Sequence, residues 1–192
     1  MPRKGVFLVA SPGLSDPRFR ETVILLLTHE EGGTVGIIVN RPTEIPVFEV
    51  FPDFSNKDIE APILFFGGPV EMDSLIFLIR SNRLLPGVVH VMEDVYFGGD
   101  AEVLQKFIKG RTSVNKLRLY IGYSGWAPGQ LDSEIKNGGW HLGSADSHTV
   151  FDKDFQKIWP HLIEPAVHPK LNIRYEWNLD FLNWKFSSFQ TK

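Results

Sequence analysis

The pair Asn40-Arg41 is a candidate for anion binding. It closes the apolar run Thr34–Asn40, so a buried strand would deliver an amide and a guanidinium together at its end. A guanidinium in that place can clamp a carboxylate or a phosphate through parallel hydrogen bonds. The alternative is a structural salt bridge, and we predict that Arg41 is partly buried and paired with Asp16 or Asp132.

Ser124 lies in a segment that resembles the setting of a nucleophilic serine. Gly122–Trp126 reads Gly-Tyr-Ser-Gly-Trp between an expected strand and an expected helix, close to the Gly-x-Ser-x-Gly pattern of a nucleophile elbow. Tryptophan replaces the last glycine, which would obstruct a tight strand-to-helix turn. Asp146 and His148 follow in the right order but are poorly spaced for a triad. We therefore interpret Ser124 as a turn residue and predict no catalytic residue.

His141, Asp146 and His148 carry metal-ligating groups within eight residues. Their spacing matches neither His-Glu-x-x-His nor an i, i+4 pair on a helix. Histidines that lie on the surface or in hydrogen-bonded loops are the favoured interpretation, and no metal is predicted. The chain has no cysteine, which excludes disulfides, thiolate nucleophiles, iron–sulfur clusters and cysteine zinc sites.

Two glycine-rich turns lack the other parts of a phosphate site. Gly67–Pro69 has neither a following helix nor a lysine, so it is not a P-loop. Gly98–Asp100 leads into an expected helix, but the Asp100 carboxylate would satisfy the free amides and repel an anion. Asp100 is therefore predicted to be a helix cap, and no cofactor is predicted.

The composition is that of a soluble globular protein. The chain has 192 residues, a net charge of −3, 43% hydrophobic residues and 22% charged residues. No run approaches the ~18 apolar residues of a membrane span, and the N-terminus lacks the apolar region of a signal peptide, so we expect a cytoplasmic protein. The weak acidity and the lack of a helix-turn-helix or basic stripe argue against direct DNA binding.

Strand-like apolar runs outnumber helices and often follow one another directly, which favours an α+β fold with a largely antiparallel sheet. The expected strands are Gly5–Ala10, Thr22–Thr28, Thr34–Asn40, Ile63–Phe66, Leu75–Ile79, Val88–Met92 and Leu117–Ile121. His29–Gly33 is expected to join the second and third strands as a hairpin with a longer loop. Three helices are expected, at Asp100–Gly110, Pro128–Asn137 and Asp152–Trp159, the last closed by Pro160.

The C-terminal tail alternates apolar and polar residues from Leu171 to Phe181, which predicts a strand. Its face of Ile173, Tyr175, Trp177 and Phe181 is too apolar to remain in water. We expect this face to be buried either on the same chain or in a homodimer, through strand addition or an exchanged arm.

Several separate motifs occur together in an order and spacing that resemble the AlgH/YqgE family of small bacterial proteins. They are Ala10–Arg20 (Ala-Ser-Pro-Gly-Leu-Ser-Asp-Pro-Arg-Phe-Arg), His29, Gly36–Pro42, Gly67–Pro69, Gly122–Trp126, Gly129–Glu134 and Trp140. The resemblance covers residues 5–163. The family's Gly-Gln-Leu-Glu pattern ends here in Asp132, and its pattern does not require a hydroxyl at the position of Ser124.

This resemblance implies one α+β domain, which we place at residues 1–165. The aromatic tail is longer than is typical of the family, so the β extension expected over 166–192 rests on its own alternating pattern. It implies a strongly bent, mostly antiparallel sheet that forms a pseudo-barrel flanked by about three helices. The family is often described as a group of transcriptional regulators, without an agreed activity.

Two hypotheses about function follow from these observations. The first is a non-enzymatic protein that binds a ligand or regulates transcription indirectly. The second is a small-molecule site or a hydrolase-like enzyme at the strand ends. The candidate ligand-binding residues for such a site are Asn40, Arg41, Gly67, Gly68, Trp126 and Gln130.

Overall fold

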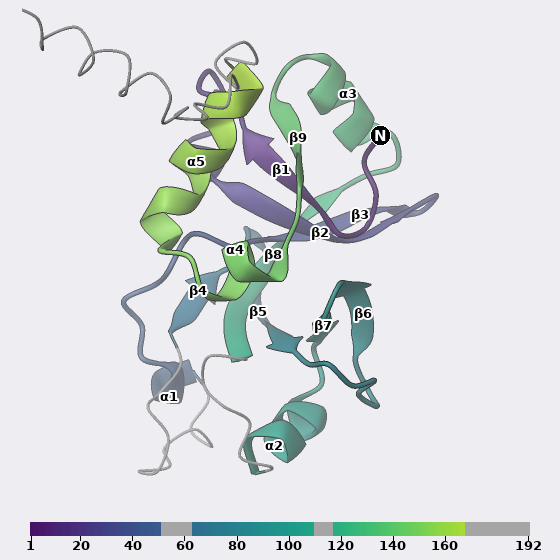
Figure 1. The fold of residues 1–192 in the computed structure, drawn as a ribbon, viewed down its shortest axis with the longest axis vertical. Helices are drawn as coiled ribbons and strands as arrows, with labels where there is room; N and C mark the ends of the chain where they lie inside the picture. Colours follow the sequence, from purple (N-terminus) through teal and green to yellow (C-terminus); the bar gives the residue numbers. More distant parts are fainter. Residues whose placement is uncertain (51–62, 110–116, 168–192) are drawn as a thin grey trace, which may run out of the picture.

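The computed structural model describes residues 1–50, 63–109 and 117–167 (Figure 1). The strands in this part of the chain are β1 (Val6–Ala10), β2 (Val23–Glu30), β3 (Gly33–Ile38), β4 (Leu64–Phe66), β5 (Val70–Arg80), β6 (Val89–Met92), β7 (Val95–Gly98), β8 (Leu117–Trp126) and β9 (Trp140–Ser144). The helices are α1 (Val47–Val50), α2 (Ala101–Lys109), α3 (Gln130–Lys136), α4 (Ser147–Phe151) and α5 (Phe155–Val167), with a 3-10 turn, η1, at Pro17–Phe19.

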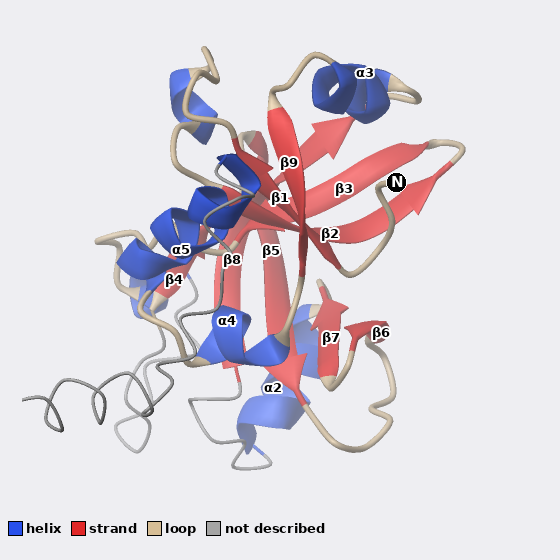
Figure 2. Cartoon of the chain, turned by 45° about the horizontal axis from the view of Figure 1, so that its top comes forward, coloured by secondary structure: helices blue, strands red, loops and turns tan. Residues whose placement is uncertain are grey.

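The nine strands form one open sheet in the order β6-β7-β5-β8-β3-β2-β1-β9, with β4 added parallel to β8. All other pairings are antiparallel. The first part of β8 pairs with β4 and β5, whereas its end, Ser124–Trp126, pairs with β3. The sheet bends where β8 passes from one group of strands to the other (Figure 2). The α+β fold with a mostly antiparallel sheet is confirmed, and this sheet does not close.

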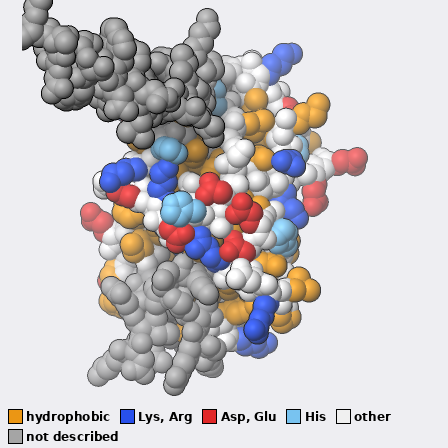
Figure 3. All heavy atoms as spheres, in the orientation of Figure 1, with side chains coloured by type: hydrophobic (Ala, Val, Ile, Leu, Met, Phe, Trp, Pro, Cys, Tyr) orange, Lys and Arg blue, Asp and Glu red, His pale blue; other side chains and the backbone are white. Residues whose placement is uncertain are grey.

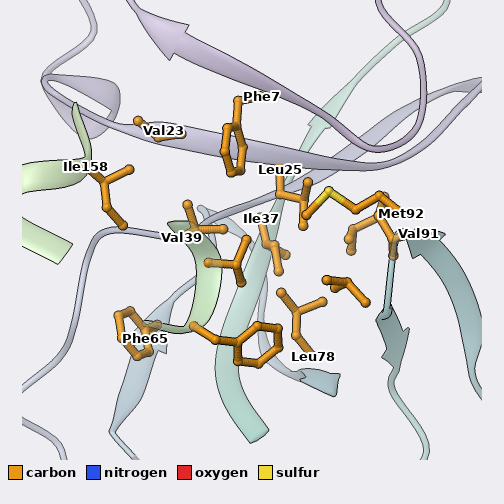
Figure 4. Packing of buried hydrophobic residues seen from close by; sticks show 14 of the residues in the cluster. Phe7, Val23, Leu25, Ile37, Val39, Phe65, Leu78, Val91, Met92 and Ile158 are labelled. Atoms are coloured by element: carbon orange, nitrogen blue, oxygen red, sulfur yellow. The ribbon is translucent and has the colours of Figure 1, made fainter. Parts of the chain in front are cut away.

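The main hydrophobic core lies on one side of this bent sheet. Alternate residues of β1 and β2, such as Phe7 and Leu25, meet Leu78 of β5 and Val91 of β6 in one buried cluster (Figure 4). Helix α5 covers the cluster with Ile158 and Ile163. Fully burying one such side chain stabilises the fold by about 1.5–3 kcal/mol.

The other face of the sheet carries two further clusters. The remaining residues of β1 and β2, including Leu8 and Ile24, pack with Leu131 of α3. Phe77 and Leu119, from β5 and β8, pack with Leu104 of α2. Strands β1 and β2 are thus apolar on both faces, as expected for strands covered on both sides.

Asp100 caps α2, as predicted from the sequence. Its Oδ1 accepts hydrogen bonds from the backbone amides of Glu102 (2.8 Å) and Val103 (3.1 Å). These are two of the four amides that a helix leaves without a partner at its start.

Helix α5 does not end where the sequence predicted. It begins at Phe155 and continues through Pro160 and Pro165 to Val167. Proline removes one hydrogen bond of the helix, but packing compensates here: Ile158 and Ile163 are buried, and Nε1–H of Trp159 donates to the Ala10 carbonyl at 2.8 Å.

Three local predictions about the strands also need correction. The hairpin between β2 and β3 is tight, because β2 extends to Glu30 and β3 begins at Gly33; His29 therefore lies in β2, where Nδ1 is 2.7 Å from Thr34 Oγ1. Strand β8 continues through Gly122–Trp126, so Ser124 lies in a strand rather than at a strand-to-helix turn. Strands β7 and β9 were not predicted.

The predicted strand in the tail and the proposed role of the tail in a homodimer fall on residues outside the described part of the chain. Helix α5 continues to Val167, two residues beyond the predicted domain limit at 165. Within the described residues, no helix is long and apolar enough to span a membrane.

Candidate functional site

The side chains of Asn40 and Arg41 bind the backbone at and just before the start of β2. Their polar atoms are therefore engaged within the protein. Asn40 Oδ1 accepts the Val23 amide at 2.8 Å, and its Nδ2 donates to the Glu21 carbonyl at 2.9 Å. The Arg41 guanidinium donates to the carbonyl of Arg18 and, at 3.0 Å, to that of Arg20. Partial burial lowers the pKa of this guanidinium.

The predicted ion pair of Arg41 with Asp16 or Asp132 is wrong. Asp16 pairs with Arg18 at 2.7 Å and accepts the Arg18 backbone amide at 2.9 Å. In this loop the Asp16 carboxylate binds Arg18. The backbone carbonyl oxygens of Arg18 and Arg20 instead accept hydrogen bonds from Arg41. Carbonyls therefore take the place of the expected acid.

Gly67 and Gly68 lie where the connection between β4 and β5 contacts the backbone of β8. The Gly67 amide donates to the Ile121 carbonyl at 2.8 Å, and its carbonyl accepts the Ile38 amide at 2.9 Å. A Cβ on Gly67 would overlap the Gly122 carbonyl, and one on Gly68 would overlap Tyr123 and Ser124. These two glycines permit close approach of the β4–β5 connection to β8 and leave no space for a ligand between them.

Ser124 belongs to the same close contact. It is 1% exposed, and its Oγ lies 3.3 Å from the Gly67 carbonyl to which it donates. No hydrogen bond joins it to a histidine among the described residues, so the hydroxyl acts as an interior hydrogen-bond donor and lacks the base that would activate a nucleophile.

Trp126 and Gln130 meet at a residue that the predicted site did not include, Glu134. The indole Nε1–H groups of Trp126 and Trp140 donate to Glu134 Oε2 at 2.9 and 2.8 Å, and Gln130 Nε2 donates to Glu134 Oε1 at 2.9 Å. Gln130 Oε1 accepts the Ala127 amide at 3.0 Å. The three donors come from the end of β8, from α3 and from the start of β9.

The end of α3 positions this carboxylate. Gly138 has a φ of 77° and donates to the Ile135 carbonyl at 3.0 Å, while the Gly139 amide donates to the Glu134 carbonyl at 2.9 Å. This is a Schellman ending, in which glycine adopts the left-handed conformation at low cost. The Ser11 amide then donates to the Gly139 carbonyl at 3.0 Å, and the Ser11 hydroxyl donates to that of Gly138 at 2.5 Å. The 11–15 loop is thereby held against the helix end.

An open pocket of about 480 Å³ lies between this loop and the end of α3. Its lining is mostly polar or glycine: Ser11, Gly13, Leu14, Ser15, Glu134, Asn137, Gly138, Gly139 and His141. Its volume is in the range of small-molecule sites. Glu134 is therefore a residue of the pocket lining whose carboxylate accepts hydrogen bonds from Trp126 and Trp140.

Two of the motifs quoted for the family resemblance, Ala10–Arg20 and Gly129–Glu134, contain residues that line this pocket. Neither indicates that the loop packs on the helix end, because β9 brings them together by pairing with β1, Ala10 opposite Trp140. Asn40, Arg41, Gly67 and Gly68 do not line the pocket.

The three suspected metal ligands lie in different settings. His141 lines the pocket, Asp146 caps α4 by accepting the Thr149 amide at 2.7 Å, and His148 Nδ1 is 3.2 Å from Asp152 Oδ2. Among the described residues, no group of three or more metal-ligating side chains lies close enough together to hold a metal ion.

Charged side chains of both signs gather over α4 (Figure 3). Arg80 forms a bidentate ion pair with Asp152, the residue that follows α4, with N–O distances of 3.1 and 2.7 Å. The Arg80 hydrogen bonds lower the pKa of the Asp152 carboxyl. Arg80 also lies over the Phe151 ring, 5.0 Å from its centroid, so this cluster fastens α4 to β5.

The fold and the pocket define a small α+β protein with one bent open sheet and a polar pocket at the end of a short helix. Two solved structures share the fold. The protein DIP2367 from Corynebacterium diphtheriae has a TM-score of 0.73 and 24% identity, covering 86% of this chain and 87% of its own. The AlgH protein from Pseudomonas aeruginosa has a TM-score of 0.67 and 27% identity, covering 95% of each chain.

The chain belongs to the AlgH-like family, whose sequence model matches residues 7–168. The UPF0301 protein of Chlorobaculum tepidum is 36% identical over 158 residues, covering 82% of this chain and 83% of the relative. The corresponding protein of Chlorobium limicola has the same identity and coverage. The resemblance inferred from the motifs is thereby confirmed. The function of this family is not established.

Proposed function

We propose that this AlgH-like protein binds a small polar molecule in the pocket between the 11–15 loop and the end of α3. The observation that carries the proposal is the Glu134 carboxylate, which three hydrogen bonds hold at the pocket wall. Orienting a charged group at a cavity before a ligand arrives reduces the entropy lost on binding.

Binding without catalysis is the better interpretation of the pocket. Ser11, His141 and Glu134 all line it, and these are the residue types of a hydrolytic triad. However, the Ser11 hydroxyl donates to the Gly138 carbonyl, and Glu134 binds two indoles and an amide. Among the described residues, no hydrogen bond joins His141 to either of them, whereas an activated nucleophile needs such a contact with its base.

A ligand-binding role is compatible with the regulatory description of the family. Ligand binding in the pocket would change how this protein interacts with a partner protein. It would not act through direct DNA binding, because a net charge of −3 does not favour binding to the phosphate backbone. Regulation would then be indirect.

A fragment screen by amide NMR tests this proposal with two matched glycine variants. At both Gly13 and Gly32 an added Cβ meets no atom within 4 Å, so a side chain can begin at either position without a clash at Cβ. Gly13 lines the pocket, so Gly13→Tyr should fill it, whereas Gly32 lies in the β2–β3 turn and does not line it. We expect polar fragments to shift the amides of Gly13, Leu14 and Gly139 in the native protein.

The same fragments should shift these amide signals in Gly32→Tyr as they do in the native protein. In Gly13→Tyr the fragments should no longer shift the amide signals of Leu14 and Gly139. The proposal is wrong if no fragment shifts these amides in the native protein. It is also wrong if the Leu14 and Gly139 shifts persist unchanged in Gly13→Tyr.

A further inference from the structure

The donors that hold the Glu134 carboxylate carry no charge. Two are indole N–H groups, of Trp126 and Trp140, and the third is the Gln130 side-chain amide. The ion pairs of the described residues involve other acids, namely Asp16, Asp94, Asp152 and Asp154. Glu134 is therefore oriented but not neutralised by the described part of the protein.

One acceptor position of this carboxylate has no hydrogen-bond partner among the described residues. An ionised carboxylate offers about four lone-pair positions, and three are taken: two on Oε2 and one on Oε1. The remaining position is on Oε1. A group bound there would complete the hydrogen bonding of Glu134 and balance its charge.

The remaining lining of the pocket also favours a positive group. Its other side chains with polar atoms are Ser11, Ser15, Asn137 and His141, and no lysine or arginine lines it among the described residues. A cation would therefore meet no fixed positive side chain and one fixed carboxylate. Charge-assisted hydrogen bonds of this kind are about twice as strong as neutral ones.

The packing of Trp126 and Trp140 argues against a quaternary ammonium as the cation. Trp126 and Trp140 are only 6% and 3% exposed, and they pack edge to face with ring centroids 6.1 Å apart. Trp140 is also packed edge-on with Phe19, at 5.7 Å. Their rings are turned into the core and do not form an aromatic cage for a quaternary ammonium. Recognition would rely on an N–H directed at Glu134.

We infer that the ligand of this pocket carries a cationic N–H group, a primary or secondary ammonium or a guanidinium, which Glu134 Oε1 receives. This inference rests on the proposed function and specifies its ligand class. Trp126, Trp140 and Gln130 act as positioning residues, because each reaches the ligand only through Glu134.

Three probes of matched shape test the inference on the full-length protein: n-butylammonium, n-butanol and butyltrimethylammonium. The Nε1–H signals of Trp126 and Trp140, assigned through Trp126→Phe and Trp140→Phe, report directly on Glu134. We expect n-butylammonium to shift both signals and to bind at least about tenfold more tightly than either of the other probes. That ratio corresponds to about 1.4 kcal/mol.

Glu134→Gln keeps an oxygen for the indoles but removes the charge, and we expect it to weaken n-butylammonium binding by a similar factor. Asp132→Asn removes an exposed charge from the same helix, outside the pocket lining, so it should retain binding. The inference is overturned if the alcohol or the quaternary ammonium binds as well as the primary amine, or if Glu134→Gln leaves amine affinity unchanged. If fragments of other classes shift the pocket amides while n-butylammonium does not, the ligand class is wrong and the proposed function stands.

Discussion

Trp126 and Trp140 come from two different strands, β8 and β9, and donate to the same oxygen, Glu134 Oε2, at 2.9 and 2.8 Å. Both indoles are buried. One acidic side chain therefore satisfies two buried donors and joins the bend of the sheet to its edge strand.

Removing this acceptor should destabilise the fold. Glu134→Ala leaves two buried indole N–H groups without a partner, each at a cost of about 1–3 kcal/mol. We expect the free energy of unfolding, measured in urea, to fall by about 2–4 kcal/mol, since water would reach part of the vacated space. Asp132→Ala, an exposed position on the same helix, should change it by about 0.5 kcal/mol or less. Equal effects of the two variants would mean that the shared acceptor is unimportant for stability.

The Arg41 guanidinium should stabilise the fold in a way that salt does not screen, because its partners are carbonyls. Arg41→Met should lower the free energy of unfolding by about 1.5–3 kcal/mol at both low and high ionic strength. Arg18→Met, which removes an exposed ion pair with Asp16, should have a much smaller effect, and only at low salt. A strong salt dependence of the Arg41→Met effect would instead indicate an ion pair.

The contact of the β4–β5 connection with β8 should not tolerate a side chain. Gly122 has a φ of 65°, and a Cβ there would overlap the Gly68 carbonyl. Left-handed backbone alone costs about 1–2 kcal/mol for alanine, so Gly122→Ala should lower the melting temperature by at least about 2–4 °C. Gly32→Ala, where the added Cβ meets open space, is the control. A Gly122→Ala protein as stable as Gly32→Ala would contradict this packing.

Asp152 should contribute to stability in a pH-dependent way. Its pKa is lowered chiefly by hydrogen bonds from Arg80, so the folded protein favours the ionised form. The stabilisation is complete above the ordinary value of 3.8 and is lost as the pH falls through the lower folded pKa. Asp152→Asn should therefore be less stable than the native protein at pH 7 but not in strong acid, by urea unfolding at several pH values. The exposed Asp73→Asn should track the native protein; a constant difference for Asp152→Asn would exclude this linkage.

The sequence predicted most of the fold because the apolar runs are short, bounded by glycine and proline, and alternate with few helices. It failed where tertiary contacts override local rules. Pro160 lies inside α5 because buried side chains on both sides of it hold the helix on the core. Strand β8 passes through Gly122–Trp126 because Gly67 and Gly68 approach it so closely.

The candidate site was predictable only in part. Trp126 and Gln130 were proposed as ligand-binding residues, but neither lines the pocket. Both donate to Glu134, which was not proposed, because its acceptor role depends on β9 bringing Trp140 to the same point. Asn40 and Arg41 had the residue types of an anion site. Only the structure reveals that their polar groups bind backbone of the preceding loop.

The central claim is that the pocket beside Glu134 is a binding site, and intermolecular NOEs test it most directly. The Leu14 methyl groups line the pocket and can be labelled with carbon-13 in an otherwise deuterated protein. We expect NOEs from the protons of the tightest-binding fragment to these methyls and to the His141 ring. NOEs from that fragment only to other residues, such as those around Asn40 and Arg41, would contradict it.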